Sequence, residues 1–310
     1  MQVHNDFSKL QQIKNPVVTT GTFDGVHLGH KVIINRLNRL AREIDGESVL
    51  ITFHPHPRRV LYPESKGKGL KLINTQREKV FLLEQTGLDH LVVINFTKEF
   101  AETTSEEFLE KILLRKLGAK RIIVGFNHYF GHNREGDFQY LFEMAKTHGF
   151  EAEEIPEQDL ENETVSSTII RKALSEGKIQ RANAYLDHFF TCIGPLKDGH
   201  PVCRQIGFPS FTLGIEEDVK LIPPEGVYAV SIRIDDQRYK GMLNIKIYDH
   251  QDTPSVQLHL FDYTKPTALL GKYITVFFHK RMRDELTLAE RSSLKKQLER
   301  DKEQIEQLIY

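Results

Sequence analysis

Several features that would indicate particular classes of protein are missing from this sequence of 310 residues. Its two cysteines, Cys192 and Cys203, cannot form a disulfide framework or a four-ligand zinc site, so we expect packed, reduced thiols. Its longest apolar runs, such as Val49–Ile51, are far shorter than the roughly 20 residues that a membrane helix needs. Residues 1–14 are polar and mixed in charge, unlike a secretory signal. We therefore expect a cytoplasmic protein that does not use a membrane as a partner.

An excess of charge of one sign is also missing. The chain has 42 Lys and Arg residues against 43 Asp and Glu residues, a formal net charge of −1. This balance argues against a protein whose whole surface binds nucleic acid. Hydrophobic residues at 39% and charged residues at 27% are typical of a folded globular chain, and the length favours two domains. The sequence leaves the oligomeric state open.

The first half of the chain alternates short apolar runs with segments of helical periodicity. We expect buried, β-branched strands at 16–20, 48–53, 91–96 and 121–124. Between them, apolar residues recur at spacings of three and four, as in Val32, Ile33, Leu37 and Leu40. This alternation predicts an α/β fold with a parallel sheet. Ligands of such sheets bind outside the carboxyl ends of the strands, so the loops after the strands are the places to search for a site.

The second half has a different pattern. A last helix is expected over 179–190, broken by Gly194-Pro195, and is followed by short alternating segments that predict an antiparallel sheet or small barrel. These segments cover 226–234, 238–247, 255–261 and 273–278. At the end of the chain, Leu294, Leu298, Ile305 and Leu308 share one face of a charged helix that we expect to pack on its own domain. The domains predicted are 1–187 and 188–310.

The most informative segment is GTFDGVHLGH, residues 21–30, directly after the first strand. Glycines allow the backbone to approach a phosphate, and the helix that follows points its positive N-terminus at the same place. His27 and His30 share one face of that helix start. Two imidazole donors there suit a polyphosphate whose charge grows during a reaction. The segment is neither a Walker loop nor a dinucleotide-binding GxGxxG motif.

Three other segments permit two interpretations each. TFHPHP, residues 52–57, is either a rigid turn or part of a site with an aromatic ring beside imidazole. GFNHYFG, residues 125–131, supplies either core aromatics or neighbours for a flat ring ligand. SSTIIR, residues 166–171, is either an ordinary capped helix start or a clamp for a triphosphate. The histidines at 54, 128 and 132 do not predict a metal site, because proline and glycine interrupt them.

Taken together, GTFDGVHLGH, TFHPHP, GFNHYFG and SSTIIR resemble the motifs of the bacterial FAD synthetase family. Members of that family join an FMN adenylyltransferase to a riboflavin kinase module. The resemblance implies a Rossmann-like nucleotidyltransferase domain of the HxGH type, followed by a small antiparallel β-barrel domain with a C-terminal helix. It also implies ATP and FMN as substrates, with Mg²⁺, in a transfer of AMP from ATP to the phosphate of FMN.

The resemblance implies a role for each matching residue. His27, His30, Ser167 and Arg171 would be catalytic, with the two histidines on the ATP phosphates. The ATP-binding set would be Gly21, Thr22, Phe23, Asp24, Gly25, His27, His30, Ser166, Ser167, Thr168 and Arg171. The FMN-binding set would be Phe53, His56, Pro57, Asn127 and Tyr129.

The second half departs from the family where the riboflavin kinase needs its catalytic groups. The family's Pro-Thr-Ala-Asn segment is here Pro209-Ser210-Phe211-Thr212, in which Phe211 adds bulk. The family's catalytic glutamate is replaced by Gln257, whose amide cannot accept a proton from riboflavin at neutral pH. A positioned base contributes about 10²–10⁴-fold to the rate of such a reaction. We therefore expect Ser210, Thr212 and Gln257 to mark a degenerate kinase site.

The expected protein is thus an FMN adenylyltransferase with an inactive kinase-like domain. The FMN phosphate is mostly dianionic at neutral pH, since its second pKa is near ~6, and needs no general base. Direct displacement at the α-phosphorus therefore suits the residues present. Two alternatives are a bifunctional enzyme that makes FMN and FAD from riboflavin, and a protein that senses flavin and regulates.

Overall fold

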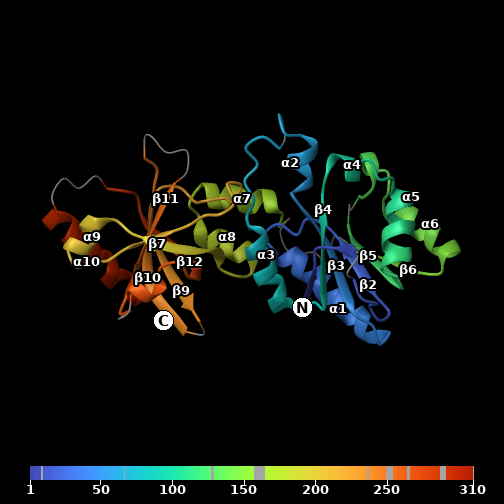
Figure 1. Ribbon diagram of the computed structural model, residues 1–310, viewed down its shortest axis with the longest axis horizontal. Helices are drawn as coiled ribbons and strands as arrows, with labels where there is room; N and C mark the ends of the chain where they lie inside the picture. Colours follow the sequence, from blue (N-terminus) through green and yellow to red (C-terminus); the bar gives the residue numbers. More distant parts are fainter. Residues whose placement is uncertain are drawn as a thin grey trace. The chain divides into compact units, whose positions relative to one another are not determined.

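The computed structural model describes residues 1–7, 10–65, 67–126, 129–156, 165–235, 237–248, 254–263, 266–286 and 291–309. The chain divides into two compact units (Figure 1). The first unit contains Met1–Leu70 and Lys79–Ser166, and the second contains Lys71–Glu78 and Ser167–Tyr310. Residues 71–78 and 167–187 therefore pack with the second unit, although they precede residue 188. The functional division into an adenylyltransferase domain, 1–187, and a kinase-like domain, 188–310, stays a prediction.

The first unit is built on a parallel six-stranded sheet, as predicted. Its strand order is β1-β4-β3-β2-β5-β6, and every pairing is parallel. The bounds are β1 Gln2–His4, β2 Val17–Thr20, β3 Ser48–His54, β4 His90–Asn95, β5 Arg121–Gly125 and β6 Glu151–Ile155. The chain moves from β2 to one side through β3 and β4, then returns to the other side with β5. This reversal beside β2 is the position where such sheets bind ligands.

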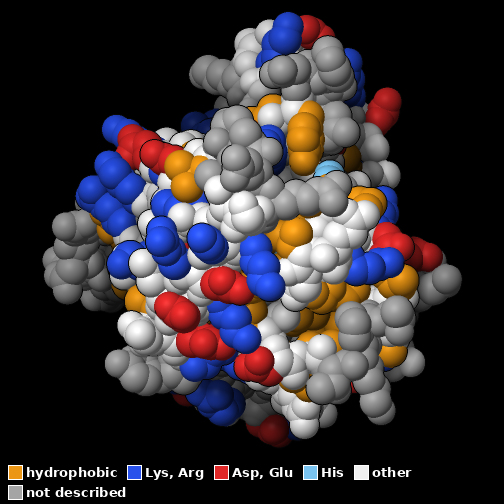
Figure 2. All heavy atoms as spheres, turned by 90° about the vertical axis from the view of Figure 1, so that its left-hand side faces the viewer, with side chains coloured by type: hydrophobic (Ala, Val, Ile, Leu, Met, Phe, Trp, Pro, Cys, Tyr) orange, Lys and Arg blue, Asp and Glu red, His pale blue; other side chains and the backbone are white. Residues whose placement is uncertain are grey.

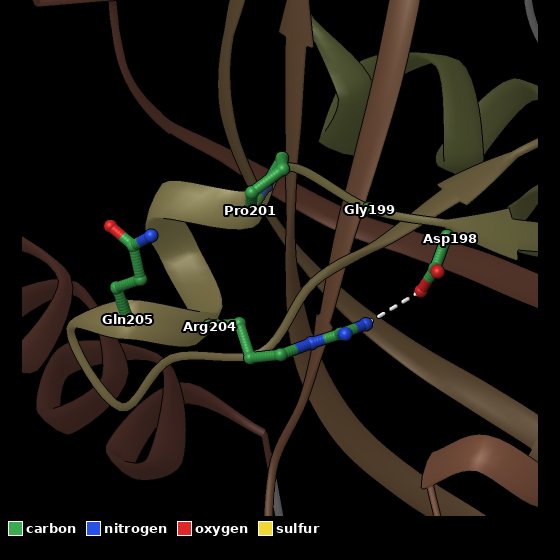
Figure 3. Close-up of a pocket in the computed structure, with 5 residues that line it drawn as sticks. All are labelled: Asp198, Gly199, Pro201, Arg204 and Gln205. Carbon is green, nitrogen blue, oxygen red and sulfur yellow. Dashed lines mark hydrogen bonds and ion pairs between the residues drawn. The ribbon is translucent and has the colours of Figure 1, made fainter.

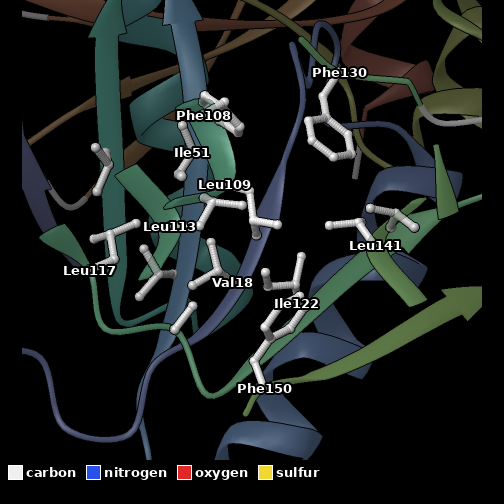
Figure 4. Close-up of a cluster of buried hydrophobic side chains, with 14 of the residues drawn as sticks. Val18, Ile51, Phe108, Leu109, Leu113, Leu117, Ile122, Phe130, Leu141 and Phe150 are labelled. Carbon is white, nitrogen blue, oxygen red and sulfur yellow. The ribbon is translucent and has the colours of Figure 1, made fainter. Parts of the chain in front are cut away.

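Helices cover both faces of this sheet because its strands alternate their side chains between two cores. On one face, Val17, Leu50 and Leu91 pack with Ile34 and Leu37 of α1. On the other, Val18 and Ile51 pack with side chains of the helices from 105 to 148 (Figure 4). The helical segments of the unit are α1 Leu28–Glu43, α2 Pro57–Leu61, α3 Gln76–Leu83 (its first three residues belong to the second unit), η2 Glu84–Thr86, α4 Lys98–Ala101, α5 Ser105–Glu107, the π-helical η3 Phe108–Lys116, η4 His132–Arg134 and α6 Phe138–His148.

The second unit is a closed antiparallel barrel with helices beside it. Its strand order is β10-β11-β8-β7-β12-β9, and every pairing is antiparallel. The bounds are β7 Phe190–Asp198, β8 Phe211–Leu213, β9 Gly226–Ile234, β10 Gln237–Lys246, β11 Ser255–Leu260 and β12 Tyr273–Arg283, with α7 Ser167–Ser175, α8 Ile179–Leu186, α9 Pro201–Gln205, η6 Pro266–Leu269 and α10 Arg291–Leu308. The expectation of a small barrel is confirmed.

The expected helix over 179–190 is wrong at its end. Helix α8 ends at Leu186, because Asp187 takes a left-handed conformation with φ 56°. Phe190 begins β7, and Gly194-Pro195 lies inside that strand instead of breaking a helix. The Pro195 carbonyl accepts a hydrogen bond from the Gly214 amide at 2.9 Å.

Helix α10 packs on the barrel through the predicted apolar face. Leu298 and Ile305 are buried against Val227, Met242 and Phe261, while Leu294 and Leu308 are partly buried in the same cluster. On the face of the molecule in Figure 2, Lys and Arg side chains lie interspersed with Asp and Glu side chains. No helix among the described residues is long and apolar enough to cross a membrane.

A buried ion pair fixes residues 71–78 within the second unit. The Lys220 ammonium donates to a Glu78 carboxylate oxygen at 2.6 Å, and the two side chains are 0% and 1% exposed. Lys220 also donates to the carbonyls of Ile73 at 2.7 Å and Thr191 at 2.8 Å. The other Glu78 oxygen accepts from the Ile193 amide at 2.9 Å. Both charges are thus well supplied with partners, as a buried ion pair requires.

Candidate active site

The loop after β2 carries the motif that the sequence singles out, and its backbone is strained. Phe23 has φ 47° and Val26 φ 43°, both left-handed, as is Gly25 at 94°. A β-branched residue such as Val26 rarely adopts this conformation, and its surroundings must hold it there. The Gly21 amide donates to the Ile51 carbonyl at 3.0 Å, which fixes the start of the loop against β3. Strain of this kind is concentrated at functional sites.

The structure brings His27 and His30 together. Their rings stack with centroids 3.6 Å apart and planes inclined by 19°, and the Phe23 ring lies 4.7 Å from that of His30. His27 immediately precedes α1, and its carbonyl accepts from the Lys31 amide at 3.0 Å, as the first turn of a helix requires. The histidine pair therefore lies at the N-terminus of a 16-residue helix, where an anion is favoured.

Burial keeps His30 neutral in the absence of a ligand. Desolvation lowers the His30 pKa well below its usual value of 6.5, and the neighbouring His27 and Lys79 lower it further. Its Nδ1 atom is buried and has no hydrogen-bond partner among the described residues. A neutral imidazole in such a position can donate to a phosphate, or take up a proton when an anion arrives.

Lys79 is a residue of this site that sequence reasoning missed. It lies on α3, is only 7% exposed, and its ammonium donates to the Thr22 carbonyl at 2.8 Å. The hydroxyl of Thr52, at the end of β3, donates to the same carbonyl at 3.2 Å. The local sequence does not indicate that Lys79 is buried, because a single lysine in a charged helix with weak apolar periodicity is typical of the solvated surface.

The predicted ATP-binding residues 21–25 all lie in this strained loop. Asp24 is buried, with 2% of its surface exposed, and provides a carboxylate among the loop's backbone groups. A side chain at position 21 would displace the Phe23 ring, because a Cβ there would lie 2.9 Å from its Cε2 atom. Among the described residues, no group of three or more His, Cys, Asp or Glu side chains is arranged to hold a metal ion.

The TFHPHP segment ends β3 and begins α2. Phe53 packs edge-on against Phe96 with ring centroids 5.5 Å apart, and also lies near Phe100. His56 is the N-cap of α2, with its Nδ1 accepting from the Arg58 amide at 3.2 Å, and Pro57 is the first helical residue. Each of these three residues thus has a structural role, and their role in FMN binding stays a prediction.

The remaining predicted flavin residues follow β5. Tyr129 is 42% exposed, and the Arg134 guanidinium lies 4.4 Å from its ring centroid. Phe126 is similarly exposed, at 41%. Exposed aromatic rings can stack on a planar ligand, which leaves Tyr129 available for that role. Asn127 lies outside the described residues.

Ser166 ends the first unit, and Ser167, Thr168 and Arg171 lie on α7 in the second. The helix begins at Ser167, within the segment predicted to open a helix, and buries Ile170, Ala173 and Leu174. Thr168 is exposed and Arg171 is half-buried. Their joint action with the histidines on a triphosphate stays a prediction.

In the barrel, the three residues expected to mark a degenerate kinase site are joined by hydrogen bonds. Gln257 pairs with Thr212 across β11 and β8, and its amide nitrogen donates to the Thr212 hydroxyl at 3.0 Å. Its amide oxygen accepts from the Ser210 hydroxyl at 3.3 Å. The Thr212 hydroxyl in turn donates to the Asp198 carbonyl at 3.1 Å. These three side chains are uncharged and satisfy one another.

Phe211, the residue that adds bulk to this segment, does not lie in the cluster. Successive side chains of a strand point to opposite faces, so Phe211, which pairs with Leu258, faces away from Thr212 and Gln257. It is 5% exposed and fills the hydrophobic core instead. The bulk of Phe211 therefore does not enter the Gln257 cluster.

A small cavity of about 260 Å³ adjoins the cluster (Figure 3). It is lined by Asp198, Gly199, Pro201, Arg204 and Gln205. Arg204 extends from α9 to form an ion pair with Asp198 at 2.6 Å. Gly199 passes directly over Ser210, since a Cβ there would lie 2.1 Å from the Ser210 carbonyl oxygen. The segment after Gly199 forms a short helix, α9.

The first unit has a Rossmann-like parallel sheet with a histidine pair after β2, and the second unit is a closed barrel. This combination defines an HxGH-type nucleotidyltransferase fold followed by a kinase-like module. Family models agree: that of FAD synthetase matches residues 9–169, and that of riboflavin kinase matches 186–309. The chain belongs to the family of bifunctional riboflavin kinase/FMN adenylyltransferases.

Individual relatives match nearly the whole chain. The bifunctional riboflavin kinase/FMN adenylyltransferase of Bacillus subtilis (strain 168) is 31% identical over 303 residues, which are 96% of this chain and 93% of the relative. The protein of the same name from Listeria monocytogenes is 31% identical over 293 residues, 93% of this chain and 91% of the relative. The crystal structure of a protein described as a macrolide-efflux protein from Streptococcus pneumoniae is 26% identical, with a TM-score of 0.84 over 97% of each chain.

Proposed function

We propose that this protein is an FMN adenylyltransferase that transfers AMP from ATP to FMN, and that its barrel has lost riboflavin kinase activity. The stacked pair of His27, at the end of the strained loop, and His30, in the first turn of α1, carries the first part of the proposal. The uncharged cluster around Gln257 carries the second. Membership of the family supports the adenylyltransferase part directly.

In the proposed reaction, an oxygen of the FMN phosphate bonds to the α-phosphorus of ATP, the bond from that phosphorus to the α–β bridging oxygen breaks, and pyrophosphate leaves. The FMN phosphate is mostly dianionic at neutral pH and needs no base. His27 and His30 donate to the phosphate oxygens on which negative charge accumulates. The N-terminus of α1 adds its positive potential.

Other residues complete the proposed site. Gly21, Thr22, Phe23 and Gly25 line the nucleotide, and Ser166, Ser167, Thr168 and Arg171 bind the triphosphate. Phe53, His56, Pro57, Asn127 and Tyr129 border the flavin. Asp24 is a suitable ligand for the Mg²⁺ that accompanies ATP, because this ion is bound through one or two carboxylates together with phosphates. Magnesium would neutralise phosphate charge when bound.

The kinase part of the proposal follows from the chemistry of Gln257. Riboflavin presents a primary alcohol, which attacks a phosphate only when a base begins to remove its proton. The Gln257 amide accepts no proton at neutral pH, and its oxygen and nitrogen already bond to Ser210, Thr212 and Ser255. A second candidate is the full bifunctional enzyme, which the names of the relatives favour.

One paired assay separates the candidates. The full chain with Mg²⁺ and ATP is given either riboflavin or FMN, and flavin products are separated by chromatography. The proposal expects FAD from FMN and no FMN from riboflavin. Formation of FMN from riboflavin would establish the bifunctional enzyme, and FAD from neither substrate would favour a flavin sensor. As a further control, Gln257→Glu supplies a carboxylate at the position of the missing base, and we expect it to leave the kinase inactive while Thr212 remains.

A further inference from the structure

Two donors to one carbonyl hold the strained loop that leads into the histidine pair. The Thr22 carbonyl accepts from the Lys79 ammonium at 2.8 Å and from the Thr52 hydroxyl at 3.2 Å. Thr22 immediately precedes Phe23, the first left-handed residue of the loop. Lys79 and Thr52 come from α3 and β3, so both neighbours of the loop in the first unit hold it at the same atom.

Lys79 is unusual for a lysine because it is nearly inaccessible. It is 7% exposed, and Thr52 is fully buried. Burial of an ammonium group is unfavourable unless hydrogen bonds compensate, so the contact with Thr22 has an energetic reason to persist. A second bond, from Nζ to the Thr52 hydroxyl at 3.4 Å, helps to fix its position. The charge is therefore held in place beside the loop.

The loop in turn determines where the imidazoles lie. The Phe23 ring packs against His30, and His30 stacks on His27. A shift of the Thr22 carbonyl would rotate the adjoining peptide and move the Phe23 ring away from His30. The chain of contacts thus runs from Lys79 through Thr22 and Phe23 to the histidine pair.

We propose that Lys79 is a positioning residue of the adenylyl transfer site, which holds the Thr22 carbonyl so that the loop presents His27 and His30 to the phosphates of ATP. This inference rests on the proposed function and deepens it. Lys79 acts through the loop, and its ammonium serves a protein carbonyl instead of the nucleotide.

The test uses the full chain and four variants: Lys79→Met, Lys79→Arg, Thr52→Val and, as a control, Lys68→Met, whose side chain is 73% exposed. FAD formation is measured against ATP and against FMN. Lys79→Met should raise the KM for ATP by about tenfold or more, the ratio expected when a hydrogen bond to a charged group is lost. The KM for FMN should stay close to its original value. The KM for ATP of Lys79→Arg should lie between those of the unmodified chain and Lys79→Met. Lys68→Met should change neither KM.

A readout independent of activity is the NMR titration of the His30 imidazole without ATP. His30 is faced by His27 from its own segment and by Lys79 from α3. Removing the ammonium should therefore raise the His30 pKa in Lys79→Met, whereas Lys79→Arg keeps it low. A purely structural lysine far from the imidazole would not change this value.

Several outcomes would overturn the inference. One is an unchanged KM for ATP in a folded Lys79→Met protein, and another is an unchanged His30 titration. If Lys79→Met fails to fold, Thr52→Val decides, because it removes one of the two donors to Thr22 and keeps the charge; an unaltered KM for ATP there refutes the proposal. If the unmodified chain makes no FAD from FMN, the proposed function fails first, and the two failures are distinguishable.

Discussion

The imidazole of His30 stacks on that of His27 at a centroid separation of 3.6 Å, with a buried Nδ1 that has no hydrogen-bond partner among the described residues. Two rings so close cannot both be positively charged imidazolium ions without repulsion, and burial already favours the neutral form of His30. An incoming polyphosphate reverses this preference, since its negative charge stabilises an imidazolium. The histidine pair can therefore gain a proton when a polyphosphate binds.

This response predicts proton uptake when ATP binds. The His30 pKa lies well below 6.5 in the free protein and should rise beside the triphosphate. In the pH range between the two values, ATP should bind more tightly as the pH falls. Calorimetric titrations at pH 6.5 in buffers of different ionisation enthalpy measure the protons taken up. His30→Asn, which donates without titrating, should take up fewer, and equal uptake by both proteins would contradict the prediction.

A single added methyl group should disturb the same site. In Gly21→Ala, the new Cβ would lie 2.9 Å from Cε2 of Phe23, and the ring must move away from His30. We expect a severalfold higher KM for ATP, with the KM for FMN nearly unchanged. Steady-state FAD formation with each substrate varied in turn tests this. An unaltered KM for ATP would show that the Phe23 ring moves without consequence.

Breaking the buried Glu78–Lys220 pair should strongly destabilise the second unit. Lys220→Met leaves a buried carboxylate without its partner, which costs about 3–5 kcal/mol. The double variant Glu78→Gln with Lys220→Met removes both charges and should lose less. Urea unfolding of the full chain gives both values. The exposed pair Lys14–Asp45, at 2.5 Å, provides the control, because Lys14→Met should cost only about 0–1 kcal/mol. Equal losses in the buried and exposed pairs would refute the argument.

Acid should destabilise the barrel through His259. Desolvation lowers the pKa of this buried side chain from 6.5 to about 4, so the unfolded chain takes up the proton first as the pH falls. Stability is therefore complete above about pH 6.5 and is lost between 6.5 and 4. At pH 5 the contribution of His259 to this loss should be about 2 kcal/mol. Urea midpoints at pH 7 and pH 5 measure it, and the difference should shrink in His259→Gln. A variant with the same pH dependence as the original protein would exclude His259 as the cause.

Local patterns predicted the regular parts of the fold well. The β-branched runs before residue 125 became β2, β3, β4 and β5 with ends within about one residue, since buried parallel strands have few alternatives. The short edge strand β1 and the acidic strand β6 escaped notice, because neither has a long apolar run. The apolar residues after Leu186 fit the period of a helix, but the left-handed Asp187 ends α8 before them.

The candidate site was predictable where it is contiguous in sequence. Residues 21–30 lie together because a strand, a loop and a helix follow one another directly. Lys79 reaches the loop from a distant helix, and no spacing in the sequence shows that contact. The orientation of Phe211 was likewise hidden, because it depends on the register between β8 and β11. Contacts between distant segments were thus the part that the sequence alone did not reveal.

Residues Lys71–Glu78 have a practical consequence for anyone who wishes to dissect this protein. They are packed among barrel residues, yet in the chain they stand in the middle of the other unit. A fragment that stops at residue 187 keeps Glu78 and discards Lys220, and the complementary fragment does the reverse. No single cut of the chain therefore separates the two units intact. A chimera that borrows the barrel of a relative must import the matching short insert as well.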